Sequence, residues 1–254
     1  MQTSQTAAVE LSWIPLGAGG HSVRFNGRVF EAIAAASRHR RRCDLYHAAL
    51  VVELDGDRYA IELAPSPNAD GASRGVVATG AVGSRHAGRL RLFRYEVRCW
   101  RGGSIPDLGE AVGGPRRLTS DPAVARQLLD LAATVPTPVW GRDELHTGEM
   151  WNSNSVTAWL TATAGLPTDD LRPPPRGRAP GWDAGLEVAR RSSAHERGLV
   201  ETWEATATSS KARPNWPAGE ASRSSGTARS RHPPGACAPS RTLALPSPSS
   251  STRR

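Results

Sequence analysis

Alternating apolar and polar residues predict β-strands in the first half of the chain. The clearest signal is a pair of runs, Leu45–Leu54 and Arg58–Leu63, separated by the Asp55-Gly56-Asp57 segment. An Asp-Gly turn between two such runs is typical of a β-hairpin. Further strands are expected in three places: around the Asn26-Gly27 turn, at Gly75–Ala78, and at Leu90–Trp100, where alternation predicts that Phe93 faces the core.

Two helices are predicted in the second half. Asp121-Pro122 opens the first, as a capping residue followed by Pro at the first helical position, and Val135-Pro136 ends it. The second begins in the polar run Asn152–Ser155 and ends at Gly165. Its apolar face repeats at i, i+3, i+4 and i+7, through Val156, Trp159, Leu160 and Thr163. Strands followed by helices predict an α+β fold, with an antiparallel sheet packed against a few helices.

The polar run at the start of the second helix is the first candidate for chemistry. A helix N-terminus carries four unpaired N–H groups and the positive end of the helix dipole, which favour an oxyanion or a nucleophile losing its proton. Two interpretations stay open. Either Ser153 or Asn152 merely caps the helix, or Ser153 is a nucleophile.

Composition divides the 254 residues into a folded part and two flanking segments. Residues 1–10 are polar and are expected to be disordered, and residues 11–191 form one α+β domain. From Ser192 onward Ser, Pro, Ala and Arg dominate and no apolar periodicity survives. A segment of this kind cannot bury enough apolar surface to offset its chain entropy, so residues 192–254 are predicted to be a disordered tail.

The net charge of +8 is concentrated in that tail. The tail has nine Lys and Arg against four acidic residues, which leaves only +3 for the longer front part. All but one of the basic residues are Arg, a uniform choice that coding bias in a GC-rich genome produces. The run Arg38–Arg42 fits a nucleic-acid patch or an exposed loop equally well, so we see little reason to expect nucleic acid as a partner.

The cysteines and the hydropathy pattern exclude several classes. Cys43, Cys99 and Cys237 form no C-x-x-C pair and have no spacing with His that suits zinc, so neither a metal nor another cofactor is expected. Cys99 reads as a small core residue. No secretory signal is visible, and no uncharged apolar run approaches the roughly 20 residues that a membrane span needs. A cytoplasmic location is the default expectation.

His47, at the start of the first strand of the hairpin, is the candidate base for a nucleophile at Ser153. A helix N-terminus lowers the pKa of a nucleophile, and an imidazole accepts its proton. At these residues the chain resembles the circularly permuted papain-like superfamily, which includes the PPPDE peptidases and the lecithin:retinol acyltransferase relatives. Tyr46-His47-Ala48-Ala49-Leu50 resembles the base strand, and Asn152-Ser153-Asn154-Ser155-Val156 resembles the nucleophile motif.

The resemblance spans roughly Leu45 to Leu166 and implies a permuted papain-like fold. It implies that Ser153 takes the place of the usual cysteine, that Glu62 orients His47, and that Trp151, Asn152 and Asn154 line a binding cleft. Residues 141–156 and 177–186 also resemble an uncharacterised actinobacterial family. Cys43 is a further nucleophile candidate, but a poor one at the edge of a basic loop.

Ser153 stands where the papain-like superfamily has a cysteine, so the activity of that superfamily cannot be transferred directly to this chain. A hydroxyl is far less acidic than a thiol, so a site built for a thiolate does not automatically activate it. One reading is a hydrolase or acyltransferase acting on amide or ester bonds, with an unidentified small-molecule, peptide or acyl substrate. A second is a catalytically inactive binding module, and a third is nucleic-acid binding through Arg38–Arg42 and the tail. Whether Glu62 reaches His47 depends on the hairpin register: a two-residue loop brings it diagonally close, and a three-residue loop turns it away.

Overall fold

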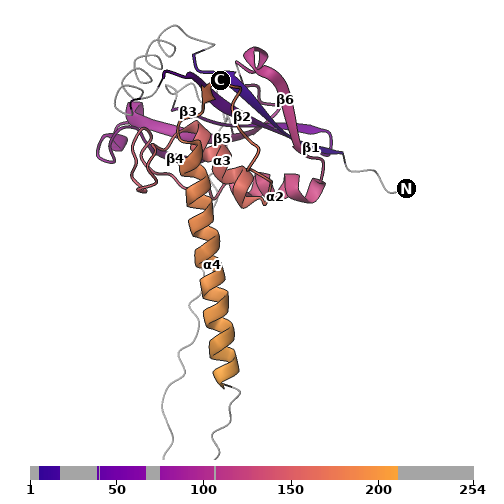
Figure 1. Ribbon diagram of the computed structural model, residues 1–254, viewed down its shortest axis with the longest axis vertical. Coiled ribbons are helices and arrows are strands. Elements are labelled where there is room, and N and C mark those ends of the chain that lie inside the picture. Colours follow the sequence, from indigo (N-terminus) through magenta and orange to yellow (C-terminus); the bar gives the residue numbers. More distant parts are fainter. Residues whose placement is uncertain (1–5, 18–38, 40, 67–74, 106, 211–254) are drawn as a thin grey trace, which may run out of the picture. The chain divides into compact units, whose positions relative to one another are not determined.

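The fold is built on an antiparallel sheet with helices against it, so the predicted α+β class is confirmed (Figure 1). The computed structural model describes residues 6–17, 39, 41–66, 75–105 and 107–210. The sheet strands are β1 (Ala7–Pro15), β2 (Asp44–Leu54), β3 (Asp57–Pro65), β4 (Val76–Ala81), β5 (Arg94–Arg101) and β6 (Val112–Thr119), in the order β4-β5-β3-β2-β1-β6. A two-residue strand, β7 (Gly177–Arg178), pairs in parallel with the start of β2.

The predicted hairpin is present as β2 and β3, and its loop has two residues. Leu54 pairs with Asp57, and the residues between them, Asp55 and Gly56, have φ angles of 55° and 85°. Positive φ at both central positions is the backbone of the tight hairpin turns that Asp-Gly favours. Of the two registers that the sequence allowed, this is the one that puts Glu62 on the same face as His47.

The two hairpin strands separate after five paired positions. The β2–β3 ladder ends at the pair Leu50 and Ile61. Beyond it β3 continues to Pro65 while paired only with β5, and β2 continues back to Tyr46 while paired with β1. A gap therefore opens in the middle of the sheet rather than at its edge.

The two faces of the sheet bury different clusters. Leu50 and its neighbours at alternate positions of β2 face the main core, which the helices cover. Ala49 and Val51 face the opposite side and pack with Ile14, Ala60 and Ile105 in a smaller cluster. Because side chains alternate along a strand, His47 lies on the face of the smaller cluster.

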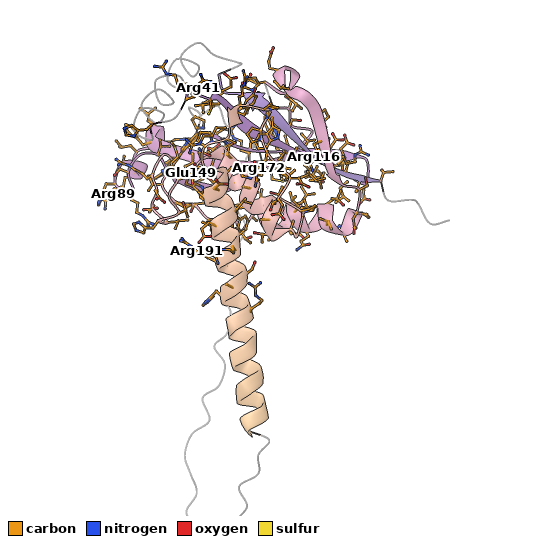
Figure 2. All side chains as sticks on the ribbon, in the orientation of Figure 1. Arg41, Arg89, Arg116, Glu149, Arg172 and Arg191 are labelled. Atoms are coloured by element: carbon orange, nitrogen blue, oxygen red, sulfur yellow. The ribbon has the colours of Figure 1, made fainter. Side chains whose placement is uncertain are left out.

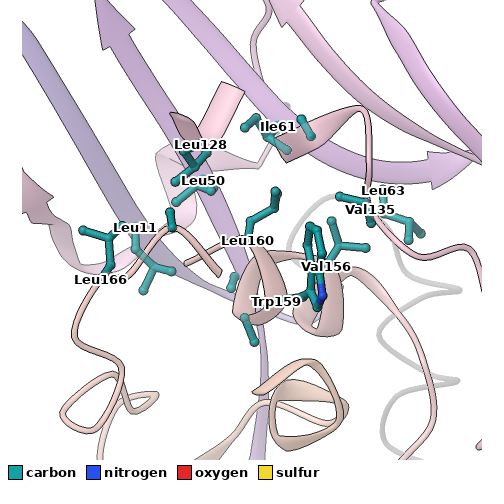
Figure 3. Packing of buried hydrophobic residues seen from close by; sticks show 14 of the residues in the cluster. Leu11, Leu50, Ile61, Leu63, Leu128, Val135, Val156, Trp159, Leu160 and Leu166 are labelled. Carbon is teal, nitrogen blue, oxygen red and sulfur yellow. The ribbon is translucent and has the colours of Figure 1, made fainter. Parts of the chain in front are cut away.

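Helices α2 (Pro122–Ala132) and α3 (Ser153–Thr163) both pack against the sheet and agree with the predicted positions. Asp121 caps α2 and accepts a hydrogen bond from the Ala123 N–H at 2.8 Å. Figure 3 shows Leu160 of α3 beside Leu50, in the core that also holds Leu128 of α2. Val156, Trp159 and Leu160 of the predicted apolar face are buried, but so is every residue from 154 to 161, so the middle of α3 is enclosed on all sides.

A third helix, α4 (Trp182–Ser210), corrects the predicted start of the tail. It continues past Ser192, so the disordered tail was predicted to begin too early; residues 211–254 lie outside the described residues. The sequence lost apolar periodicity there, but the segment after Ser192 contains good helix formers, among them Ala194, Glu196 and Arg197. At the other end β1 begins at Ala7, inside the segment 1–10 that was predicted to be disordered.

The strand predicted at Leu90–Trp100 is shorter than expected. Residues 87–93 instead form two short 3-10 helices, η1 (Ala87–Arg89) and η2 (Arg91–Phe93), and β5 starts at Arg94. Tyr95 is buried as the alternation predicted, but Phe93 is exposed. A third such turn, η3 (Leu108–Glu110), follows β5. The turn predicted at Asn26-Gly27 lies outside the described residues. No helix in the described ranges has the length and apolar character needed to cross a membrane.

Candidate functional site

A small cavity lies where β2 and β3 separate. Its volume is about 70 Å³, and its wall includes His47, Glu62 and Ser153, together with Ile61 and Ile105. The three polar residues come from β2, from β3 and from the first turn of α3. The residues to which the sequence assigned chemistry thus surround one cavity, although Ser153 lies about a hundred positions from the other two.

Ser153 is the first residue of α3 and is not its cap. The cap is Asn152, whose side-chain oxygen accepts hydrogen bonds from Asn154 N at 2.9 Å and from Ser155 N at 3.3 Å. Ser155 Oγ in turn accepts from Asn152 N at 3.1 Å, which completes a reciprocal capping box. Within the described residues, the Ser153 hydroxyl and N–H have no hydrogen-bond partner. Asn152 therefore caps the helix. The hydroxyl and N–H of Ser153 take no part in the cap and stay available for chemistry.

Asn154 joins the helix to the strand that carries His47. Its side-chain oxygen accepts from Ala48 N at 2.7 Å, and its amide nitrogen donates to Tyr46 O at 3.1 Å. These two backbone groups face the side from which β3 has departed. The amide of Asn154 therefore replaces the missing strand, and it grips β2 on both sides of His47.

Thr157 extends the same substitution by one turn of α3. Its hydroxyl donates to Ala48 O at 3.5 Å, next to the N–H that Asn154 satisfies. Asn154 and Thr157 are both buried. Buried backbone groups need hydrogen-bond partners. Asn154 and Thr157 supply them along the edge of β2 that β3 no longer covers, so the two strands can separate.

The imidazole of His47 is half-buried on the face of the smaller cluster. Burial lowers the pKa of His47 below its ordinary value, because the charged form loses solvation, and the negative charge of Asp107 opposes this shift. His47 Nε2 is buried and has no hydrogen-bond partner among the described residues. A neutral imidazole has the protonation state that a general base requires.

Glu62, the expected partner of His47, is held instead by Arg98. Arg98 Nη1 lies 3.1 Å from Glu62 Oε1, and Arg98 Nη2 lies 2.9 Å from Glu96 Oε2. The Arg98 side chain is only 5% exposed, so this is a buried ion network rather than a surface pair. In the described part of the chain no hydrogen bond joins Glu62 to His47.

Asp107 is the carboxylate that sequence reasoning missed. It precedes η3, in the segment that packs Ile105 and Leu108 onto the His47 face of the sheet. No strand register or motif places a residue in this loop, so only the fold could bring its charge near His47.

The predicted binding residues turn out to support the site from behind. Trp151 is buried in the main core and does not line the cavity. Asn152 and Asn154 both donate to Pro180 O, at 2.8 and 2.9 Å. Glu149 holds the same segment by accepting from Gly181 N at 2.7 Å, and it lies beside the start of α4 in Figure 2.

This bracing also leaves no room for larger side chains. Gly181 has a φ angle of 84°, and a Cβ on it would overlap the amide of Asn152. A Cβ on Gly185 would overlap the backbone of Ser155, so α4 crosses α3 at van der Waals contact. In the sequence, residues 177–186 carried only a resemblance to an uncharacterised family, and nothing in their pattern linked them to the helix start.

The cysteines stand apart from the cavity. Burial raises the pKa of Cys99 to about 11, which suits a core residue rather than a nucleophile. Cys43 precedes β2 and does not line the cavity. Arg38 and Arg40, in the basic run, and Cys237 lie outside the described residues.

No family model matches this chain, and neither a curated protein nor a solved structure matches it. The chemistry of the cavity is therefore argued from its own geometry.

Proposed function

We propose that the gap between β2 and β3 is the active site of a serine hydrolase or acyltransferase that acts on amide or ester bonds, on a permuted papain-like fold. The observation that carries the proposal is that Ser153, at the first position of a helix, and His47, with a vacant buried nitrogen, line the same cavity. A cavity of about 70 Å³ has room for roughly two water molecules. It suits a reacting carbonyl group, with the rest of the substrate outside.

The reaction follows the usual course of acyl transfer. Ser153 Oγ attacks the carbonyl carbon, and its proton passes to His47 Nε2. Collapse of the tetrahedral intermediate breaks the bond to the leaving amine or alcohol, which takes the proton from His47. Water or an acceptor alcohol or amine then attacks the acyl-serine, gives up a proton to His47, and restores the Ser153 hydroxyl.

A hydrogen-bond donor for the negatively charged oxygen of the tetrahedral intermediate lies in the same helix turn as the Ser153 side chain. Asn152 uses its side chain to satisfy the N–H groups of Asn154 and Ser155, which leaves the N–H of Ser153 without an acceptor among the described residues. That N–H and the positive helix end are suited to an oxyanion. The charge of Asp107 stabilises the imidazolium that forms when His47 is protonated.

Active-site labelling tests this function. A fluorophosphonate probe is expected to label the full chain at Ser153, and Ser153→Ala is expected to abolish labelling. His47→Ala should do the same without unfolding the protein. Ser120→Ala is the matched control, since Ser120 is exposed and lies outside the cavity. Labelling that survives Ser153→Ala, or that is absent from the folded chain, counts against an active serine.

Replacing the serine with cysteine gives a second readout that does not depend on a substrate. In a chain with Cys43 and Cys237 changed to Ser, Ser153→Cys should produce a thiol that iodoacetamide alkylates faster at pH 7 than the thiol of Ser120→Cys. The reason is that a helix N-terminus and a nearby imidazole both favour the thiolate. Equal rates for the two thiols would contradict the proposed environment.

A second candidate function is a binding module that keeps the fold without the reaction. It is favoured by the missing hydrogen bond between His47 Nε2 and Ser153, and by the engagement of Glu62 with Arg98. This function predicts no labelling of Ser153 together with an unactivated thiol in Ser153→Cys. It also predicts that Ser153→Ala leaves ligand binding intact.

A further inference from the structure

An exposed loop between β4 and β5 gathers apolar and basic side chains on one surface. In the segment 85–94, Leu90 is 62% exposed, Leu92 is 77% exposed and Phe93 is 41% exposed. These are three of the five large apolar side chains that are exposed in the described part of the chain. Single exposed apolar residues need no explanation, but three within four positions mark an interaction surface.

The charges around these side chains have one sign. The chain from Val82 to Tyr95 contains four arginines, one histidine and no acidic residue. Arg85 pairs with Glu144, whereas no ion pair involves Arg89, Arg91 or Arg94 within the described residues. Figure 2 shows Arg89 at the margin of the folded part, with its side chain directed outward. A partner for this surface must therefore be anionic and must accept apolar side chains.

The loop holds its shape without a partner. Val82 N donates to Phe93 O at 2.8 Å and closes its base, and Leu90 N donates to Ala87 O at 2.9 Å within it. Arg94 Nε donates to Gly88 O at 2.6 Å across the turn. These hydrogen bonds fix the backbone with the side chains of Leu90 and Leu92 exposed to solvent, although neither residue belongs to a strand of the sheet.

We propose that the 85–94 loop docks this protein onto the surface of an anionic lipid bilayer. A bilayer interface accepts the exposed side chains of Leu90, Leu92 and Phe93 without a complementary pocket, and Arg89 and Arg91 are available for lipid phosphates. Apolar insertion combined with basic residues is the pair of signals that reversible membrane attachment needs. This function is independent of the chemistry at Ser153.

Vesicle co-sedimentation of the full chain tests the proposal. We expect binding to vesicles of phosphatidylcholine with phosphatidylglycerol, weaker binding at high salt, and no binding to phosphatidylcholine alone. Arg89→Gln with Arg91→Gln should weaken binding by roughly 20- to 30-fold, at about fivefold for each arginine. Leu90→Ser with Leu92→Ser should weaken it by about tenfold or more. All four side chains are exposed, so these variants should unfold like the parent protein.

Two matched changes elsewhere on the sheet serve as controls. Val112→Ser removes an exposed apolar side chain and Arg58→Gln removes an exposed charge, and neither should alter binding. Equal binding to neutral vesicles would overturn the proposal. So would full binding by both loop variants, because the basic residues of 192–254 would then account for it. Self-association that the leucine variant abolishes, without vesicle binding, would assign the loop to a second copy of the chain and also overturn the proposal.

Discussion

Asn154→Ala should destabilise the protein far more than the loss of one surface hydrogen bond. The Asn154 amide makes three buried hydrogen bonds, to Ala48 N, Tyr46 O and Pro180 O. Pro180 O keeps a second donor, Asn152 Nδ2. The substitution therefore leaves two buried backbone groups without partners, both on β2 and both adjacent to His47.

The expected cost follows from those two groups. A buried polar group that loses its partner costs about 1–3 kcal/mol, so the free energy of unfolding should fall by about 2–6 kcal/mol. That is a large part of the roughly 5–15 kcal/mol that stabilises a typical domain. Asn152→Ala is the comparison, since an N-cap substitution costs about 0.5–2 kcal/mol. Urea unfolding followed by tryptophan fluorescence measures both.

A second substitution separates the two bonds to β2. Asn154→Asp keeps an acceptor for Ala48 N but places a carboxylate oxygen against Tyr46 O and Pro180 O. It should therefore be no more stable than Asn154→Ala at pH 7. Hydrogen exchange at the amide of Ala48 should accelerate in the alanine variant. A loss of stability below about 1 kcal/mol, with Ala48 still protected, would refute the idea that this amide replaces a strand.

Three further outcomes are expected. Gly185→Ala should lower the free energy of unfolding by about 1–3 kcal/mol because its Cβ overlaps Ser155, whereas Gly198→Ala, in an open part of the same helix, should be neutral or stabilising in the same denaturation assay. The pKa of His47 is lowered in the folded protein, so the unfolded chain takes up a proton on this imidazole at a higher pH, and the free energy of unfolding should fall as the pH drops below about 6.5. His47→Gln should remove this part of the pH dependence when unfolding is measured from about pH 5 to 7.5. An unchanged pH dependence would refute this assignment to His47. With Cys43 and Cys237 changed to Ser, Cys99 should resist maleimide at pH 8 until the protein is unfolded, because burial raises its pKa to about 11; rapid labelling of folded protein would contradict this.

The local elements were predictable because their signals are local. The Asp-Gly turn fixed the β2–β3 hairpin, and Asp121-Pro122 fixed the start of α2. The convergence of His47 and Ser153 was expected from a resemblance rather than from periodicity, and both residues line one cavity. Their chemical roles stay predictions.

The rest depended on contacts that no local pattern contains. Glu62 faces His47 as the two-residue loop allows, yet Arg98 of β5 holds its carboxylate, and that pairing is set by the neighbouring strand. Asp107 acts on His47 through its charge, from the irregular loop before η3. Asn154 was expected to line a binding cleft. Its hydrogen bonds to the backbone of β2 are possible only because β3 separates from β2 at that point, which the sequence did not show.

The same separation divides the sheet into two leaves. One contains β4, β5 and β3, the other contains β2, β1 and β6, and in the described part of the chain only the short β2–β3 ladder joins them within the sheet. A rotation of one leaf against the other about the Asp55–Gly56 end of the hairpin would therefore widen the gap that His47 and Glu62 line. The length of the β2–β3 ladder sets where this gap begins, so each additional residue pair formed between the two leaves would shorten the gap.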